Sequence, residues 1–232
     1  MYSGATSDLG LRCGQAACIQ AGANDRDQIE YEQMNDQVRI IGLSGTNGAG
    51  KDAIGILLSE RCGYLFISVT ELLRDEARRR GLPVERQHLR AISTEWRREF
   101  GLAVLVDRGM DVFSAAEKGR YTGIVMASLR NPYEADRVHE LGGKVVWVDA
   151  DPRVRYERVR ANASNRDRAG EDDKTFEQFV AEEEAEMHST GDAAALDMGA
   201  VKDRSDIIIM NNGSDMVALE QEVEARLGCK PQ

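Results

Sequence analysis

The residues with the clearest capacity for chemistry form the glycine-rich stretch 45–51, GTNGAGK. Glycines let backbone N–H groups converge on a polyanion without obstruction by side chains. An apolar run precedes the stretch and a helical pattern follows it, so the new helix would add its positive end. Lys51 would supply a charge for the outer phosphates. The spacing predicts a nucleotide phosphate loop made of Gly45, Thr46, Asn47, Gly48, Ala49, Gly50, Lys51 and Asp52.

The position after the lysine departs from the commonest form of this loop. Many phosphate loops carry a serine or threonine there to bind Mg²⁺, but this chain has Asp52 and then Ala53. Asp52 could contact a metal-bound water, or it could cap the helix and complement its dipole. We favour capping, and we name no protein ligand for a metal.

Apolar runs alternate with helical patterns through most of the chain. The runs are short, β-branched and nearly continuous, which is typical of parallel strands covered on both faces. The alternation predicts a three-layer α/β/α sandwich with a parallel sheet of about five strands. The expected strands are Val38–Leu43, Tyr64–Ile67, Ile124–Ala127, Val145–Val148 and Ile207–Met210. Helical faces are expected at Ile54, Leu57, Leu58 and Cys62, at Leu89, Ile92, Trp96 and Phe100, and at Met216, Leu219, Val223 and Leu227.

Composition limits the possible partners. The net charge of −10 disfavours a general nucleic-acid binder, which is usually basic. No apolar run approaches the roughly 20 residues that a membrane helix needs. The four cysteines show no metal-ligand spacing, so we expect free thiols in a reducing cytoplasm.

The polar stretch 1–33 shows no sustained apolar period, and we interpret it as a flexible leader ahead of one domain, 34–232. Met34 stands just before the first strand. One hypothesis is therefore that translation begins at Met34 and that the leader is not part of the native protein.

The phosphate loop, followed by 67–74 (ISVTELLR), resembles the P-loop nucleoside monophosphate kinases. It is most similar to their dephospho-CoA-kinase-like and archaeal nucleotide-kinase-like branches. The stretches 127–130 (ASLR) and 151–158 fit the same pattern, and the resemblance covers 38–228. It implies a P-loop NTPase fold with a small mobile lid at about 161–174. It also implies transfer of the γ-phosphoryl group of ATP, with Mg²⁺, to a nucleotide-like acceptor.

The resemblance also assigns site residues. An arginine fork can bind two oxygens of a phosphate at once. The acceptor positions would be Ser68, Thr70, Arg74, Arg97 and Arg130. The catalytic positions would be Lys51, Arg130, Arg158, Arg166 and Arg168. Arg97 could instead belong to a solvated helix face, and we assign Trp96 to the core rather than to base stacking.

Two flanking segments complete the interpretation. Pro152 suits the first turn of a helix with Asp151 as its cap, and we interpret Glu177–Glu186 as an acidic, solvated helix face. Residues 211–214 (NNGS) lie near the adenine position of the related kinases. They form either a turn with a helix cap at Ser214, which we favour, or a contact to the base.

The acceptor is left open between nucleoside monophosphates, deoxynucleoside monophosphates and dephospho-CoA. The family often has Asp-Gly at the positions of Ala127 and Ser128, where the aspartate orients Mg²⁺-bound water. Its absence, with the absent hydroxyl after Lys51, motivates a second hypothesis: a nucleotide-binding sensor or scaffold with little turnover. A GTPase switch lacks support because no NKxD-like guanine motif is present.

Overall fold

The computed structural model describes residues 39–161, 174–188, 191–213 and 215–228. Its strands are β1 (Arg39–Gly45), β2 (Tyr64–Ser68), β3 (Gly123–Ala127), β4 (Lys144–Asp149) and β5 (Ile207–Met210). Its helices are α2 (Lys51–Cys62), α3 (Val69–Arg79), α4 (Arg86–Phe100), α5 (Val104–Ala115), α6 (Pro132–Glu140), α7 (Pro152–Ala161), α8 (Phe176–Met187), α9 (Met198–Asp203) and α10 (Met216–Leu227). The predicted leader and most of the predicted lid lie outside the described residues.

The strands form one parallel sheet in the order β2-β3-β1-β4-β5. All five predicted runs are strands, with bounds that differ by one or two residues at some ends. The largest difference is in β1, which continues past Leu43 to Gly45, so the phosphate loop begins on the last residue of a strand. β1 pairs with β3 on one side and with β4 on the other. β1 is therefore the central strand, with β3 and β2 on one side of its carboxyl end and β4 and β5 on the other.

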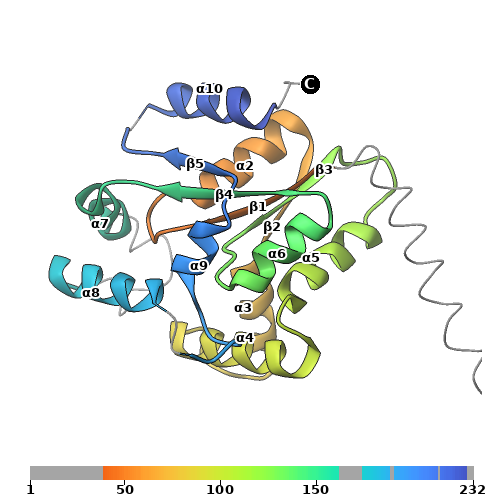
Figure 1. Cartoon of the computed structure of the whole chain (residues 1–232). Helices are drawn as coiled ribbons and strands as arrows, with labels where there is room; N and C mark the ends of the chain where they lie inside the picture. Colours follow the sequence, from red (N-terminus) through yellow and green to blue (C-terminus); the bar gives the residue numbers. More distant parts are fainter. Residues whose placement is uncertain (1–38, 162–173, 189–190, 214, 229–232) are drawn as a thin grey trace, which may run out of the picture. The chain divides into compact units, whose positions relative to one another are not determined.

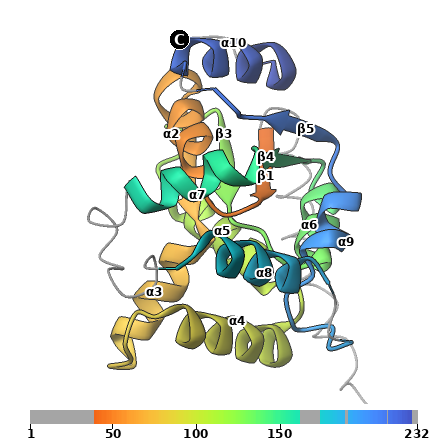
Figure 2. The same cartoon turned by 90° about the vertical axis from the view of Figure 1, so that its left-hand side faces the viewer.

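Helices cover both faces of the sheet, as the three-layer prediction requires (Figure 1). One core packs α2 and α10 against the face that carries Leu43, Val125 and Val148. The other core packs α3, α4, α5 and α6 against the face that carries Ile40, Ile124 and Met126. Figure 2, which looks onto the side of Figure 1 toward which the strand arrows point, shows α7 and α8 near the carboxyl ends of the strands.

The expected helical faces are largely buried, with exceptions at helix ends. In α2 all four predicted residues are buried. Trp96 lies in the core as predicted, but Phe100 at the end of α4 and Met216 at the start of α10 are exposed. Helix ends project past the sheet, so the last residue of an apolar stripe can lie in solvent.

Cys62 corrects the expectation of free thiols, because its side chain is disulfide-bonded. It is buried at the end of α2. The other three cysteines lie outside the described residues.

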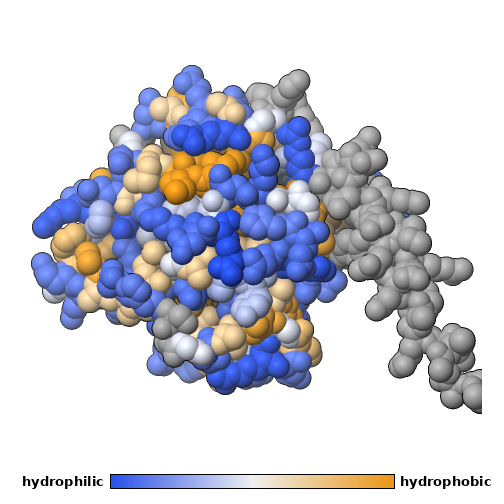
Figure 3. Space-filling view, viewed as in Figure 1, coloured by the Kyte–Doolittle hydropathy of each residue, from blue (hydrophilic) through white to orange (hydrophobic). Residues whose placement is uncertain are grey.

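Most of the surface in Figure 3 is hydrophilic, with an apolar patch beneath α10. The edge strand β5 exposes Ile208 and Met210. No helix in the described part of the chain is long and apolar enough to cross a membrane.

Candidate nucleotide-binding site

A cleft of about 690 Å³ lies at the carboxyl ends of the strands, where open parallel sheets bind their ligands. The loop after β1, the start of α3, one face of α4, the segment after β3, α7 and the start of α10 all contribute to its wall. The predicted site residues among the lining residues are Asn47, Gly48, Gly50, Lys51, Asp52, Ser68, Thr70, Arg74, Arg97, Arg130 and Arg158. Segments far apart in sequence thus meet at one cavity.

The shape of the phosphate loop depends on its glycines. Gly45, Gly48 and Gly50 all have positive φ, which side chains rarely adopt. A Cβ on Gly45 would lie 1.9 Å from the carbonyl oxygen of Val148, and one on Gly48 would lie 2.6 Å from that of Arg155. The loop therefore threads between two backbone segments that leave no room for a side chain.

Lys51 is buried and points back into the loop. Its Nζ donates hydrogen bonds of 2.7 Å to the carbonyl oxygens of Gly45 and Thr46. Burial, followed by the nearby charge of Arg130, lowers the pKa of Lys51 to about 7. The site thus holds a cation at high cost in solvation, and an anion placed beside it would be strongly favoured.

The remaining loop residues, Gly45, Thr46 and Ala49, do not line the main cleft. Gly45 and Thr46 line a second, smaller cavity of about 30 Å³, and Ala49 is fully buried. Thr46 Oγ1 donates a hydrogen bond of 2.8 Å to Asp149 Oδ1 at the end of β4. This bond ties the loop to the neighbouring strand.

Asp52 does not cap α2, which corrects our preferred interpretation. The N-cap is Gly50, and no side chain caps it. Asp52 is exposed in the first turn, where its charge complements the helix dipole, and it lines the cleft. Among the described residues no group of three or more His, Cys, Asp or Glu could hold a metal ion.

The start of α3 presents the three predicted acceptor residues Ser68, Thr70 and Arg74 to the cleft. Ser68 ends β2, and Thr70 and Arg74 lie one turn apart on the helix that follows it. The Arg74 guanidinium donates to Glu71, which also lines the cleft. Both partners of this ion pair therefore lie in the wall of the cleft.

Arg97 lines the same cleft, but its guanidinium forms a buried ion pair with Glu134. Nε and Nη2 donate to Glu134 Oε1 at 3.1 and 2.7 Å, and Nη1 donates to the carbonyl oxygen of Ala194 at 3.2 Å. Both charged side chains are almost fully buried. This environment excludes the solvated-face alternative and favours a structural role over the predicted acceptor role.

Arg130 follows β3 through an unusual turn. Ser128, just before it, has a φ of 76°, in the left-handed region, and its N–H donates to the carbonyl oxygen of Leu43. The backbone N–H of Arg130 donates to Glu134 Oε2, and its side chain donates to Glu186 Oε2 at 2.7 Å. The turn directs the guanidinium from the sheet edge toward α8.

Arg158 lies on α7, whose first turn is held as predicted by Asp151 Oδ1 accepting from the N–H of Arg153. The Arg158 side chain donates to the carbonyl oxygens of Asn211 and Gly213 at 2.9 and 2.5 Å. The predicted partners Arg166 and Arg168 lie outside the described residues.

The segment after β5 differs from our favoured interpretation. Asp215, not Ser214, caps α10, by accepting hydrogen bonds from the N–H groups of Val217 and Ala218. Asn211 donates through Nδ2 to the carbonyl oxygen of Ala49, so the turn is fastened to the phosphate loop. Asn211 and Gly213 also line the cleft, where the base contact stays a prediction.

Several charged residues at the site were not predicted. Arg86 and Arg90 extend from α4 and line the cleft, and Arg155 on α7 is buried. Glu183 and Glu186 on α8 pair with Arg155 and with Arg90. The solvated-face interpretation of Glu177–Glu186 is therefore wrong for these two glutamates. The available signal was the spacing of four that places Arg86 with Arg90 and Glu182 with Glu186 on single helix faces.

An AAA domain family model matches residues 41–185, which include the phosphate loop and most of the cleft. The chain belongs to this AAA domain family. It is also similar to a UPF0200 protein of Pyrobaculum aerophilum, at 27% identity over 80% of this chain and 95% of the relative. A UPF0200 protein of Pyrococcus abyssi is 28% identical over 75% of this chain and 88% of the relative.

Solved structures place this AAA domain among P-loop kinase-like folds. A shikimate kinase from Acinetobacter baumannii in complex with shikimate superposes with a TM-score of 0.51 at 14% identity, over 84% of this chain and 97% of that one. A tunicamycin resistance protein of Deinococcus radiodurans gives 0.51 at 16% identity, over 84% and 98%. The predicted α/β sandwich is thus confirmed. The nucleoside monophosphate and dephospho-CoA kinase branches are not singled out by these likenesses.

Proposed function

We propose that the protein is an ATP-dependent phosphotransferase that moves the γ-phosphoryl group of ATP to a small, nucleotide-like acceptor. The candidate acceptors are a nucleoside monophosphate, a deoxynucleoside monophosphate and dephospho-CoA. The observation that carries the proposal is that Lys51 and the phosphate loop share one cleft with arginines from four other segments. Phosphoryl transfer needs this arrangement, because catalysis consists mainly of positioning and charge neutralisation.

The donor side of the proposed site is the phosphate loop. Its N–H groups and the N-terminus of α2 would bind the β- and γ-phosphates of ATP. Lys51 would turn from the loop carbonyls to these oxygens, which replace the solvation that it has lost. Mg²⁺ would arrive with ATP and neutralise phosphate charge, and its usual reliance on phosphates and water suits a cleft with Asp52 as the neighbouring carboxylate.

The acceptor side would comprise Ser68, Thr70, Arg74 and Arg130, which line the same cleft as the loop. Arg158, with Arg166 and Arg168, would stabilise the charge of the transferring group. An arginine that engages only in the closed state contributes about 10³–10⁵ in rate. Closure of the segment 161–174 would also exclude water as a competing acceptor.

A sensor or scaffold with little turnover is the alternative. It is favoured by the absence of a hydroxyl after Lys51 and by Ala127, which stands buried at the end of β3 where the related kinases often carry aspartate. In either case we place the protein in the cytoplasm, with residues 34–232 as its nucleotide-binding domain, and expect neither nucleic acid nor a membrane as partner.

A coupled ADP assay over nucleoside monophosphates, deoxynucleoside monophosphates and dephospho-CoA tests the proposal, with the Lys51→Ala variant as control. We expect ADP formation that depends on one acceptor class and is lost in the variant. Tight binding of Mg-ATP without acceptor-dependent ADP would favour the sensor. No affinity for ATP or GTP in the presence of Mg²⁺ would exclude both.

A further inference from the structure

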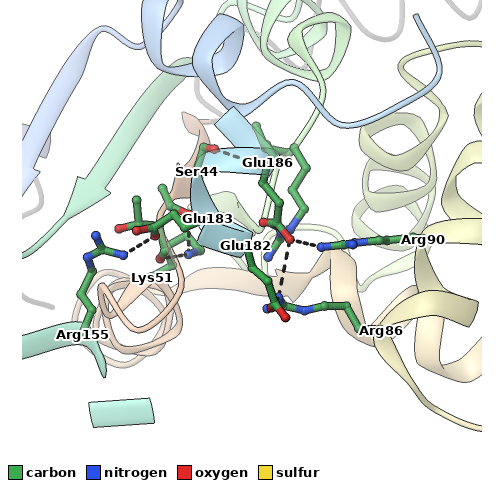
Figure 4. A network of polar contacts seen from close by, with 12 residues as sticks. Ser44, Lys51, Arg86, Arg90, Arg155, Glu182, Glu183 and Glu186 are labelled. Carbon is green, nitrogen blue, oxygen red and sulfur yellow. Dashed lines mark hydrogen bonds and ion pairs between the residues drawn. The ribbon is translucent and has the colours of Figure 1, made fainter. Parts of the chain in front are cut away.

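A carboxylate on α8 lies at the centre of three arginines that come from elsewhere in the fold. Glu186 accepts a hydrogen bond from Arg90 and one of 2.7 Å from Arg130, and Arg86 lies 3.6 Å from it. Figure 4 shows Arg86 and Arg90 extending toward Glu186 from the same side. Three guanidinium groups thus converge on one small anion.

The three arginines keep Glu186 ionised although its side chain is largely buried. The Glu186 side chain is 13% exposed, and burial alone would raise its pKa, but the charges of Arg130, Arg86 and Arg90 outweigh burial and lower the pKa to about 2. Glu182 lies 3.6 Å from Arg86, but it also accepts a hydrogen bond from Lys174. Among the described residues, Glu186 is the carboxylate that contacts all three arginines, and a ligand with more negative charge than one carboxylate would interact with them more strongly.

The arginines are reachable from the main cleft. Arg86, Arg90 and Arg130 all line it, as Arg74 does. Glu186 lines the smaller cavity, which Arg86 also lines, and it is not among the residues that line the main cleft. The carboxylate and a ligand in the main cleft would therefore reach the arginines from two different cavities.

We propose that Arg86, Arg90 and Arg130 form a subsite for a phosphate monoester of the acceptor, with Glu186 as a built-in counter-ion that this phosphate displaces. A phosphate dianion offers three oxygens to the guanidinium forks, where a carboxylate offers two and a single charge. This inference rests on the proposed function, since it supplies the second anionic contact that a nucleotide-like acceptor requires. It adds Arg86 and Arg90 as specificity-determining residues.

Calorimetric titration of the full chain with inorganic phosphate tests the subsite. A non-hydrolysable ATP analogue and Mg²⁺ are present at saturation, so that the phosphate loop is filled. Glu186→Gln keeps the shape of the side chain and removes its charge, and we expect it to bind phosphate about tenfold more tightly than the wild type does. Glu184→Gln is the matched control: Glu184 lies on the same helix, is exposed and pairs with His188. It should bind as the wild type does.

A second pair of variants keeps the test valid if Glu186→Gln does not fold. Arg90→Gln should bind phosphate about tenfold more weakly, because one charge-assisted contact is lost. Arg98→Gln, on the same helix and paired with Asp192, should leave phosphate affinity unchanged. The subsite is refuted if Arg90→Gln binds phosphate as the wild type does, or if the two control variants shift affinity as much as their test partners.

Binding of the ATP analogue to the wild type distinguishes failure of the proposed function from failure of the subsite. If the analogue does not bind the wild type, the kinase proposal fails, whatever the phosphate titration shows. The titrations are therefore repeated without the analogue in a Lys51→Ala background, which removes the cation of the phosphate loop. A difference between the Arg90 and Arg98 variants in that background supports the subsite on its own, and equal affinities refute it.

Discussion

Lys51 illustrates how a single residue can be prepared for an anion. Its ammonium group donates to two loop carbonyl oxygens, and burial with the charge of Arg130 lowers its pKa to about 7. Phosphate oxygens beside the ammonium would favour its charged form and raise the pKa again. Binding of the nucleotide and protonation of Lys51 are therefore linked.

This linkage predicts a pH-dependent affinity for ATP. Above pH 7 the free protein carries Lys51 mostly neutral, so binding must take up a proton, and affinity should fall by up to about tenfold per pH unit until the pKa of the complex is reached. Below pH 7 the free lysine is already charged and this contribution vanishes. Calorimetry of ATP binding in buffers with different heats of ionisation measures the proton uptake. A buffer-independent heat at pH 8 would contradict the prediction.

Arg74 gives a prediction about the acceptor alone. Arg74→Ala should raise the KM for the acceptor by about tenfold or more, which is the usual loss for a hydrogen bond to a charged group, and should change the KM for ATP much less. Arg78→Ala provides the control, because Arg78 is exposed one turn later on α3 and pairs with Asp75. Equal increases in both KM values would place Arg74 outside the acceptor site.

Residue types and local spacing predicted one part of the site and missed another. The phosphate loop was predicted because it follows a strand, and Arg74 and Arg130 were predicted because the resemblance assigns them and each lies near a strand end; all three line the cleft. The cluster around Glu186 was missed because its contacts are long-range: Arg90 and Glu186 are separated by 96 positions. An isolated acidic helix with outward charges has the same local pattern as α8, so only packing reveals where the charges point.

At the scale of elements, the strands were predictable and the caps less so. Parallel strands that are buried on both faces consist almost entirely of apolar residues, so they can be recognised in the sequence as short apolar runs. Caps depend on which side chain reaches the free N–H groups. Asp52 was expected to cap α2, but the left-handed turn at Gly50 occupies the cap position. Asp215 caps α10 because its carboxylate reaches two N–H groups at once.

The turn that joins β1 to the phosphate loop predicts that alanine costs more stability at Gly45 than at Gly119. Gly45→Ala would place a Cβ 1.9 Å from the Val148 carbonyl oxygen, and Gly45 pairs with Val148 across β1 and β4. We expect it to lower the free energy of unfolding by about 3 kcal/mol, because backbone must move. Gly119→Ala also has positive φ but meets nothing within 4 Å, so it should cost about 1 kcal/mol. Urea unfolding compares the two, and equal midpoints would contradict this account.

At the scale of the whole molecule, the sheet order explains where the cleft lies. Alternating strands and helices predicted a parallel sheet, but not the order β2-β3-β1-β4-β5, since that order is set by pairing between distant segments. The connection after β1 leads to β2 at one edge of the sheet and the connection after β4 leads to β5 at the other edge, so these two connections diverge and a crevice forms between them. The chain places its phosphate loop at this crevice, so fold and site have one common origin.

The ion pair between Arg97 and Glu134 joins the parts that surround this crevice. It links α4 to α6, and Arg97 also holds the carbonyl oxygen of Ala194 in the segment before α9. The side chains are 1% and 0% exposed, so removing one partner leaves the other buried without full compensation. That cost is typically about 3–5 kcal/mol.

Arg97→Met should therefore destabilise the protein by about 3 kcal/mol or more, measured by urea unfolding. Arg98→Met changes the neighbouring residue, whose side chain is 65% exposed and pairs with Asp192, and should remain within about 0.5 kcal/mol of the wild type. Below its unfolding transition the Arg97 variant should keep a near wild-type acceptor KM, because the guanidinium faces Glu134. If the variant instead has wild-type stability and a raised acceptor KM, Arg97 belongs to the acceptor site, because loss of a contact to the substrate raises KM without lowering stability.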